Sequence, residues 1–237
     1  ETLWNIEGRI QGHGDSPLSA EGLAQADALA RRLAAERPDV LYTSDLGRAR
    51  QTTEPIARAA GLVPHIEPQL RERCYGVFEG KTWPEIERDF PDQYAAHLSG
   101  DPAVRAERGE SMFEFHDRTV SALERIARES ADYKVVVVAH GGVLGMLYRH
   151  IMSIPLEAPR NYAVPNASIN RFTFRSGMWC LIAWGDLSHL DHPVPEEFAD
   201  SPDRPSDHAR RHVVPAGESS RTTPARSRSF RIWSASA

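Results

Sequence analysis

Four consecutive valines constrain the fold of this chain more than any other feature of its sequence. Residues 135–138 are all Val and lie between Lys134 and Ala139. β-branched side chains favour strand over helix, and an unbroken apolar run is typical of a strand that is buried on both faces of a parallel sheet. His140 and two glycines end this strand, and helical signals follow to about Met152. Because the strand runs directly into a helix, the sequence predicts an α/β fold with ligand sites at the carboxyl ends of its strands.

The rest of the first 190 residues alternates between helix and strand patterns. Apolar residues at helical spacing, together with caps and helix breakers, predict helices over 19–36, 45–60 and 111–130 and weaker helical signals over 83–99. Short β-rich runs predict strands over 39–43, 63–67, 168–174 and 179–184, and Ser176-Gly177 indicates a hairpin between the last two. This alternation predicts a three-layer fold, with a mostly parallel sheet and helices on both of its faces.

The composition is that of a soluble globular protein. The 237 residues are 41% hydrophobic and 26% charged, and no apolar run reaches the ~18 to 20 residues that span a bilayer. The two cysteines, Cys74 and Cys180, are too few and too far apart in the sequence for a disulfide framework. We therefore expect a cytoplasmic protein without a membrane partner.

Charge divides the chain into two parts. Residues 208–237 contain six arginines and one glutamate and carry +5, so residues 1–207 carry −10 of the net charge of −5. An acidic body argues against a nucleic acid partner, because phosphate backbones are bound by basic faces. The last residues are rich in Pro, Ser and Arg without apolar periodicity. We predict a folded domain over 1–190 and a disordered tail over 191–237.

Two strand-to-helix junctions could form one phosphate-sized pocket. Arg48 lies in the first turn of the helix that follows one predicted strand, and His140 directly follows the valine-rich strand. Helix N-termini favour anions through unpaired backbone amides and the helix dipole. The alternatives are a surface arginine and a strand-end histidine that backbone groups satisfy. The sequence around Glu72 favours a third interpretation, in which this carboxylate forms an ion pair with the flanking Arg71 and Arg73.

A series of short motifs follows the order found in a known family. The motifs are Trp4-Asn5, Gly8-Arg9-Ile10-Gln11-Gly12, Asp15-Ser16-Pro17-Leu18-Ser19, Gly22, Gln25-Ala26, Ser44-Asp45-Leu46-Gly47-Arg48-Ala49, Gln51-Thr52, Leu70-Arg71-Glu72, Gly76, Glu79-Gly80, Gly109-Glu110-Ser111, Ala139-His140-Gly141-Gly142 and Asn166-Ala167-Ser168-Ile169. Together they resemble the histidine phosphatase superfamily, in its cofactor-dependent phosphoglycerate mutase-like branch. The resemblance covers residues 1 to about 190 and leaves the tail out.

The resemblance implies a two-step phosphoryl transfer. In this family a histidine at the end of the first strand attacks phosphorus and a carboxylic acid protonates the leaving oxygen. Water or a second hydroxyl then accepts the phosphoryl group from the phosphohistidine. Glu72 matches the acid, His140 the second pocket histidine and Arg48 the phosphate-clamping arginine. Other residues that match positions on or beside the substrate pocket are Asn5, Gln11, Gly12, Arg50, Tyr75 and Gly141, although Arg50 is more typical of a helix surface. No metal or cofactor is implied.

The chain departs from the family at its first residue. The family signature is Arg-His-Gly-Glu-Thr, and this chain starts at Glu1-Thr2. The nucleophilic histidine and the first strand are therefore expected upstream of Glu1, and the chain from Glu1 onward is expected to have a gapped sheet and little turnover. His13 belongs to a loop at the pocket rim, which favours a turn or substrate-edge role over nucleophilic attack.

Three functions agree with these residues: a phosphatase for small phosphomonoesters, a phosphoglycerate mutase, and a non-catalytic phosphate-binding relative. Mutases of the family carry a longer, basic insertion after the glutamate loop, whereas here 36 residues separate Glu72 from Gly109 and they are net acidic. This favours a phosphatase that acts on a small phosphorylated metabolite. The preferred phosphomonoester and the oligomeric state stay open, with a homodimer as one alternative.

Overall fold

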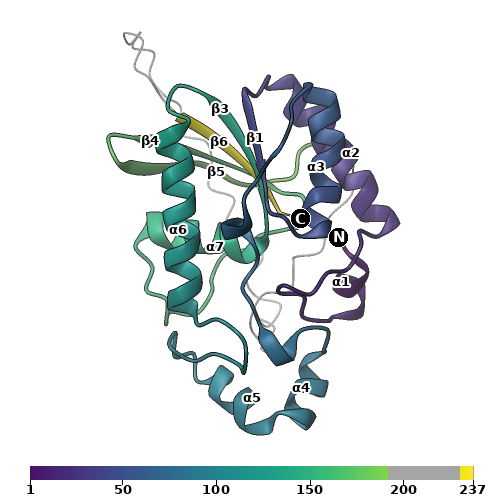
Figure 1. The fold of residues 1–237 in the computed structure, drawn as a ribbon, viewed down its shortest axis with the longest axis vertical. Coiled ribbons are helices and arrows are strands. Elements are labelled where there is room, and N and C mark those ends of the chain that lie inside the picture. Colours follow the sequence, from purple (N-terminus) through teal and green to yellow (C-terminus); the bar gives the residue numbers. More distant parts are fainter. Residues whose placement is uncertain (192–229, 237) are drawn as a thin grey trace.

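A six-stranded sheet lies between two layers of helices (Figure 1). The structure is a computed structural model that describes residues 1–191 and 230–236. Its strands are β1 Val40–Thr43, β2 His65–Ile66, β3 Lys134–Ala139, β4 Ile169–Arg175, β5 Met178–Asp186 and β6 Phe230–Ser236. They are ordered β2-β1-β3-β6-β4-β5 in the sheet; the first four in this order are parallel, and β4 runs antiparallel to both of its neighbours. The predicted three-layer, mostly parallel fold and the hairpin between the last two predicted strands are confirmed.

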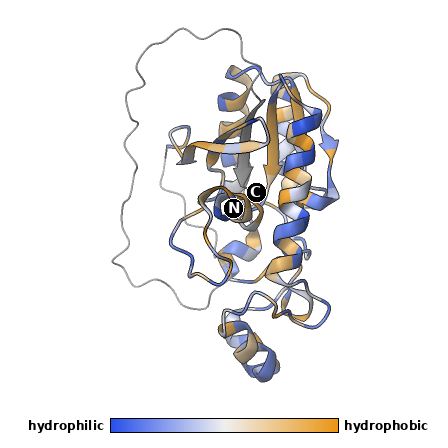
Figure 2. Ribbon diagram, turned by 90° about the vertical axis from the view of Figure 1, so that its left-hand side faces the viewer, coloured by the Kyte–Doolittle hydropathy of each residue, from blue (hydrophilic) through white to orange (hydrophobic). Residues whose placement is uncertain are grey.

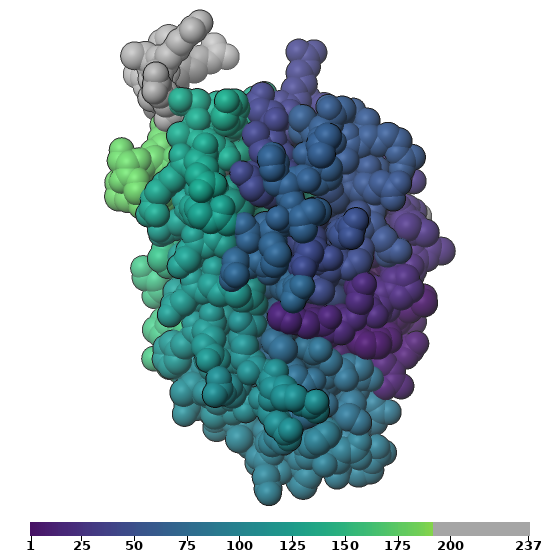
Figure 3. Space-filling model, viewed as in Figure 1, coloured from purple at the N-terminus to yellow at the C-terminus, as the bar shows by residue number. Residues whose placement is uncertain are grey.

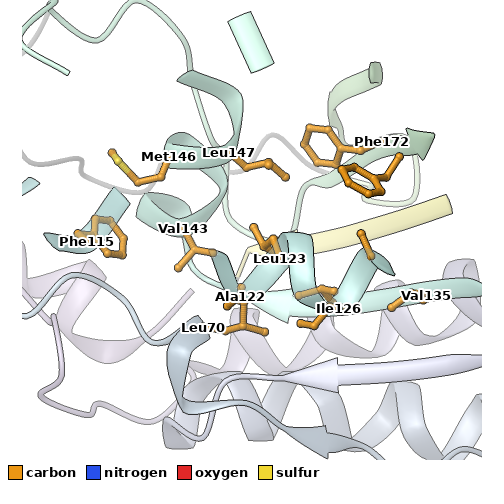
Figure 4. Packing of buried hydrophobic residues seen from close by; sticks show 14 residues of the cluster. Leu70, Phe115, Ala122, Leu123, Ile126, Val135, Val143, Met146, Leu147 and Phe172 are labelled. Carbon is orange, nitrogen blue, oxygen red and sulfur yellow. The ribbon is translucent and has the colours of Figure 1, made fainter. Parts of the chain in front are cut away.

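Alternate valines of β3 face opposite helix layers. The four long helices are α2 Ala20–Ala35, α3 Gly47–Ala60, α6 Met112–Glu129 and α7 Gly141–Met152. Val136 and Val138 pack in one core cluster with residues of α2 and α3, and Val135 and Val137 pack in another with residues of α6 and α7. Figure 4 shows the second cluster, where side chains of α6 and α7 meet those of β3 and β4. A strand with two buried faces is what the valine run predicted.

The predicted capping box at the start of α6 is present. The hydroxyl of Ser111 accepts a 3.2 Å hydrogen bond from the Glu114 N–H, and the Glu114 carboxylate accepts a 2.8 Å bond from the Ser111 N–H. These two bonds satisfy backbone donors that have no partner within the helix. They fix the position at which α6 begins.

Two short helices form a small lobe at one end of the molecule (Figures 1 and 2). They are α4 Trp83–Asp89 and α5 Pro91–Leu98, which Phe90 separates and which lie within the predicted helical segment 83–99. Their apolar residues pack onto the 3-10 helix η2 (Gly76–Phe78), where Phe78 and Ile86 are buried. We call residues 76–109 the cap. Two further short elements, α1 Leu3–Glu7 and the 3-10 helix η1 Pro68–Leu70, were not predicted.

Strand β6 lies in the interior of the sheet, between β3 and β4. Ser236 pairs with Ala139 and Ala235 pairs with Ile169, so the carboxyl end of β6 lies at the same edge of the sheet as His140. The sequence predicted disorder for these residues and a gap in the sheet. Instead, β6 fills the interior position, because open β3 and β4 edges would leave two rows of backbone N–H and C=O groups unpaired.

The other tail residues, 192–229 and 237, lie outside the described residues, and the division into a domain over 1–190 and a disordered tail stays a prediction for them. Within the described parts of the chain, every helix is too short or too polar to cross a membrane.

Candidate active site

The ends of β1 and β3 bring the two predicted junctions together. Thr43 pairs with Val138 in the register of these parallel strands, and the N–H of Ser44 donates a 3.1 Å hydrogen bond to the Val138 carbonyl. The chain therefore leaves β1 and β3 at the same edge of the sheet. From there it enters α3, which carries Arg48, and α7, which His140 precedes.

Arg48 is buried, and residues 11–15, which we call the rim loop, hold its guanidinium. Its Nη1 and Nη2 donate 2.9 Å hydrogen bonds to the carbonyl oxygens of Gly14 and Gly12, and its side chain is 0% exposed. Gly12 has a φ of 54°, and a Cβ there would lie 2.4 Å from a carboxylate oxygen of Glu79, so the close approach of the loop requires glycine. The surface interpretation of Arg48 is therefore wrong.

Carboxylates occupy the helix N-termini at both junctions. Asp15 accepts hydrogen bonds from the N–H groups of Gly47 at 3.1 Å and Arg48 at 3.2 Å, at the start of α3. Glu72 accepts one from the N–H of Gly142 at 2.8 Å, at the start of α7. The expectation that these amides would be unpaired is wrong. The reason is that loops distant in sequence supply the negative charge that the helix dipole favours.

His140 is fully buried in a positively charged environment. Burial, followed by the charges of Arg48, His13 and Arg118, holds its pKa well below the ordinary value of 6.5, so the imidazole is neutral. Within the described part of the chain, neither ring nitrogen has a hydrogen-bond partner. A buried polar group without a partner costs about 1–3 kcal/mol, which makes these nitrogens suited to a bound ligand.

Glu72 is bound to the first turn of α7, the helix that His140 precedes. The side chain is buried; Oε1 accepts a 2.7 Å bond from the Arg73 N–H and Oε2 accepts the bond from Gly142. A Cβ on Gly142 would lie 2.1 Å from Oε1, so this contact requires glycine. The Glu72 carboxylate is thus bound to the first turn of the helix whose N-cap is His140.

The two arginines that flank Glu72 bind elsewhere. Arg71 forms a bidentate ion pair with Asp45 through 2.7 and 2.5 Å hydrogen bonds, which lower the pKa of Asp45. The guanidinium of Arg73 donates a 3.1 Å bond to the backbone carbonyl of Glu110. The interpretation of Glu72 as the ion-pair partner of its neighbours is therefore wrong, because their side chains extend to other loops.

Glu79 ties the rim loop to the cap. Its Oε1 accepts hydrogen bonds from the N–H groups of His13 and Tyr75, each at 2.9 Å. The Nε2 of His13 lies 2.9 Å from the carbonyl oxygen of Glu72, and because a carbonyl only accepts, this nitrogen carries the proton. Burial lowers the pKa of His13. His13 therefore contacts the backbone of the glutamate loop from the rim.

The N-terminal segment closes the same side of the site. It lies against the cap on the face shown in Figure 3. Arg9 makes the contact, since its Nη1 donates 2.8 Å hydrogen bonds to the Gly80 carbonyl and the Glu85 carboxylate. The rim loop is thus held between α3 on one side and the cap on the other.

The remaining predicted residues divide into two groups. Gln11 is buried next to Gly12, and its Oε1 has no hydrogen-bond partner within the described residues. Tyr75 is buried in a cluster with Phe78 and Ile86. By contrast, the carboxamide oxygen of Asn5 accepts hydrogen bonds from the N–H and the hydroxyl of Thr2 at the N-terminus of α1, and Arg50 is exposed on α3. Hydrogen bonds and short contacts thus connect the segments that carry Glu72, His140, Arg48, Gln11, Gly12 and Gly141, and the roles of all nine predicted residues stay predictions.

Four charged residues that hold the pocket together were not singled out from the sequence. Asp15, Glu79 and Glu110 lie inside the short motifs quoted above, which was the available signal. Arg118 lies outside any motif. It follows Phe115 by one helical turn on the buried stripe of α6, and an arginine on an apolar stripe is the pattern that could have identified it.

The chemistry of these groups suits a phosphate monoester. Arg48 supplies a buried positive charge, neutral His140 can donate one N–H, and the Glu72 carboxyl can exchange a proton. Across residues 1–191 and 230–236, no three His, Cys, Asp or Glu side chains lie together as metal ligands. The arrangement can bind a phosphoryl group and protonate an oxygen that leaves it.

This chain belongs to the histidine phosphatase superfamily (branch 1), whose family profile matches residues 1–187. It is 40% identical over 193 residues to a metal-independent phosphoserine phosphatase of Arabidopsis thaliana, which covers 80% of this chain and 79% of the relative. It is 36% identical over 203 residues to a probable phosphoglycerate mutase GpmB of Photorhabdus laumondii, covering 84% of this chain and 94% of the relative. The resemblance drawn from the motifs is confirmed, and these relatives are enzymes that act on phosphorylated molecules.

Solved structures agree with this assignment. YhfR of Bacillus stearothermophilus superposes with a TM-score of 0.71 at 32% identity, over 80% of this chain and 94% of that chain. A phosphoserine phosphatase of Entamoeba histolytica in complex with 3-phosphoglyceric acid superposes with a TM-score of 0.70 at 26% identity, again over 80% and 94%. The fold is that of the histidine phosphatases.

Proposed function

We propose that this histidine phosphatase hydrolyses small phosphomonoesters, with Glu72 as the general acid and His140 and Arg48 as the groups that bind the phosphoryl oxygens. The observation that carries the proposal is the 2.8 Å bond that holds the Glu72 carboxylate at the first turn of α7, the helix that a buried, neutral His140 directly precedes. The acid and the oxyanion donor of a phosphoryl transfer must both reach one phosphate group, and the attachment of both residues to one helix end supports this assignment.

The proposed reaction has two steps. In the first, a nucleophilic histidine, which the family resemblance places before Glu1, bonds to phosphorus as the bond to the ester oxygen breaks, and Glu72 gives its proton to that oxygen. In the second, the Glu72 carboxylate takes a proton from water, the water oxygen attacks phosphorus, and the bond to histidine breaks to release inorganic phosphate. Arg48 and the N–H of His140 stabilise the negative charge on the phosphoryl oxygens in both steps.

Ion pairing within the cap supports hydrolysis over mutase activity. Each of the four Lys and Arg side chains between Glu79 and Gly109 has an acidic partner: Lys81 and Arg88 pair with Asp89 at 3.1 and 2.8 Å, Arg105 with Glu114 at 2.9 Å, and Arg108 with Glu107 at 3.8 Å. A mutase must hold a second phosphate group, which needs cations that face the pocket. A neutralised cap favours substrates with one phosphate.

The relatives suggest which substrate to examine first. The Arabidopsis thaliana relative is a phosphoserine phosphatase, and this chain shares 40% of its residues over 193 positions. O-phosphoserine is a small monoester whose single phosphate the pocket can hold. We propose it, or a monoester of similar size, as the substrate.

Phosphate release and isomerisation can be measured side by side. The chain is extended before Glu1 by an apolar strand and Arg-His-Gly and ends at Ser229, so that the added strand does not compete with β6 for the interior position between β3 and β4. It is assayed for phosphate release from O-phosphoserine and for interconversion of the two phosphoglycerate isomers. Glu72→Gln and His140→Ala should each lower phosphate release by about 100-fold or more. The control, Glu87→Gln at an exposed cap position, should match the parent. If the protein interconverts the isomers faster than it releases phosphate, it is a mutase and the proposal is wrong. If it binds phosphate and catalyses neither reaction, it is a non-catalytic phosphate-binding relative.

A further inference from the structure

We infer that Arg118 and Glu110 form a clamp that positions Glu72 for proton transfer. The clamp grips residues 69–74, which we call the acid loop, and anchors it to α6. The inference deepens the proposed function, since it assigns a task to two residues that act on the general acid without reaching the substrate.

The guanidinium of Arg118 donates hydrogen bonds to three carbonyl groups of the acid loop. The Nη1 of Arg118 donates to the carbonyl oxygens of Gln69 at 2.7 Å and Arg71 at 2.9 Å, and Nη2 donates to that of Glu72 at 3.2 Å. A planar guanidinium offers five donors in a fixed geometry, so these three carbonyls must keep a fixed arrangement to reach it. A lysine ammonium at this position could not reproduce that pattern.

Glu110 holds the other side of the clamp. Its two carboxylate oxygens accept hydrogen bonds from Nε and Nη2 of Arg118 at 2.9 and 2.7 Å, a bidentate pair. One of them also accepts the Cys74 N–H at 2.8 Å, and the Glu110 N–H donates to the Cys74 carbonyl at 2.9 Å. The acid loop is therefore gripped near its start by Arg118 and at its end by Glu110.

The pair is shielded enough for its geometry to persist. The side chains of Arg118 and Glu110 are only 17% and 16% exposed, and the guanidinium lies 5.0 Å from the ring centre of Phe115. Shielding strengthens charge-assisted hydrogen bonds compared with exposed ion pairs. Glu110 directly precedes Ser111, whose capping box fixes where α6 begins, and Arg118 lies in the second turn of this helix. The clamp thus holds the acid loop in a fixed position relative to α6.

The expected consequence is specific to proton transfer. The clamp fixes the backbone of Glu72, while the bond to Gly142 fixes its carboxylate. Arg48 and His140 lie on other elements, in the first turn of α3 and directly before α7. Loosening the clamp should therefore impair protonation of the leaving oxygen and leave binding of the phosphoryl group unchanged.

The test compares esters that differ in their need for an acid. Arg118→Gln, Arg118→Lys and Glu110→Gln are made in the extended chain used for the phosphatase assay. For O-phosphoserine, whose alkoxide leaves poorly, kcat/KM should fall by about tenfold or more, and for para-nitrophenyl phosphate by less than about threefold. Orthovanadate affinity should stay the same. Arg118→Lys should not restore activity, because it keeps the charge without the fork. The control is Arg125→Gln, one exposed arginine further along α6 that pairs with Glu67 and Glu129.

Amide hydrogen exchange gives a readout that needs no turnover. In the variants, residues 69–74 should exchange about tenfold faster while β3 keeps its protection. Equal losses for both esters, or unchanged exchange of the acid loop, would overturn the clamp. If the parent protein hydrolyses neither ester, the proposed function fails, and the exchange experiment still decides whether the clamp exists. A general loss of protection that includes β3 in all three variants would make Arg118 a folding residue and refute the positioning role.

Discussion

The Glu72 carboxylate and the Gly142 N–H form a 2.8 Å hydrogen bond between residues 70 positions apart in the sequence. The bond ties the acid loop to the first turn of α7, and His140 is the residue that precedes this helix. A negative charge at a helix N-terminus is stabilised by the dipole, so the helix that follows β3 serves as the anchor of the acid. Glu72 and His140, the proposed general acid and the proposed second pocket histidine, are thus both attached to the start of α7.

Replacing Gly142 by alanine should displace Glu72. The new Cβ would lie 2.1 Å from Oε1, so the carboxylate must move away from α7. We expect phosphate release from O-phosphoserine to fall by about tenfold or more, since misplacing a reacting group by about 1 Å can cost 100-fold. Steady-state kinetics on the extended chain measure this. Met152→Ala, an exposed position on the same helix, is the control, and equal activity of the two variants would contradict the role of the bond.

Removing the Asp15 carboxylate should destabilise α3 and loosen Arg48. Asp15→Ala leaves the N–H groups of Gly47 and Arg48 without their acceptor. Loss of an acceptor at a helix N-terminus lowers the free energy of unfolding by about 1 kcal/mol, which urea denaturation detects. Glu54→Ala provides the comparison, because Glu54 pairs with Arg58 on the exposed face of the same helix and should cost less than about 0.5 kcal/mol. A similar effect of both changes would mean that Asp15 acts as an ordinary surface charge.

The protein should lose stability in mild acid because His140 is buried in its neutral form. Its pKa is held well below 6.5 in the folded protein, and the unfolded chain titrates near that ordinary value. Below a pH of about 6.5 the unfolded state binds a proton that the folded state does not, so the free energy of unfolding falls as pH decreases and levels off above it. Burial shifts the pKa of His13 in the same direction. Thermal unfolding between neutral and mildly acidic pH measures the slope.

The variant His140→Gln should flatten this pH dependence. His65→Gln, at an exposed position of β2, should retain it. If both variants keep the slope of the parent protein, groups other than His140 cause the acid sensitivity.

Strand β6 should contribute strongly to stability, since it pairs with neighbours on both sides. A chain that ends at Ser229 leaves the facing edges of β3 and β4 open. We expect Tm to fall by about 5 °C or more and light scattering to rise, because open strand edges promote association. Met178→Pro is the control, as the first residue of the edge strand β5 tolerates proline better. An unchanged Tm after truncation would show that β6 adds nothing to the sheet.

Local patterns predicted the elements that are strongly periodic. The valine run, the capping box at Ser111 and the turn at Ser176-Gly177 each correspond to an observed element. The predicted strand over 63–67 is reduced to His65–Ile66, because Val63 is 86% exposed and packs against nothing that would favour a strand. Strand β6 could not be predicted from its neighbours in the chain, because its pairing partners lie almost 100 positions away in the case of β3.

Local patterns in the chain were enough to predict the two strand-to-helix junctions at Arg48 and His140, because helix and strand signals are local and place these residues at strand ends. The order of the short motifs was enough to predict the family. The partner of each charged side chain became known from the three-dimensional fold. Arg71 and Arg73 turn away from Glu72, Asp15 and Glu72 cap helices they are not part of, and Arg118 holds the acid loop. The physical reason is that ion pairs and hydrogen bonds depend on distances in space, and the loops that set those distances are joined only when the sheet has assembled.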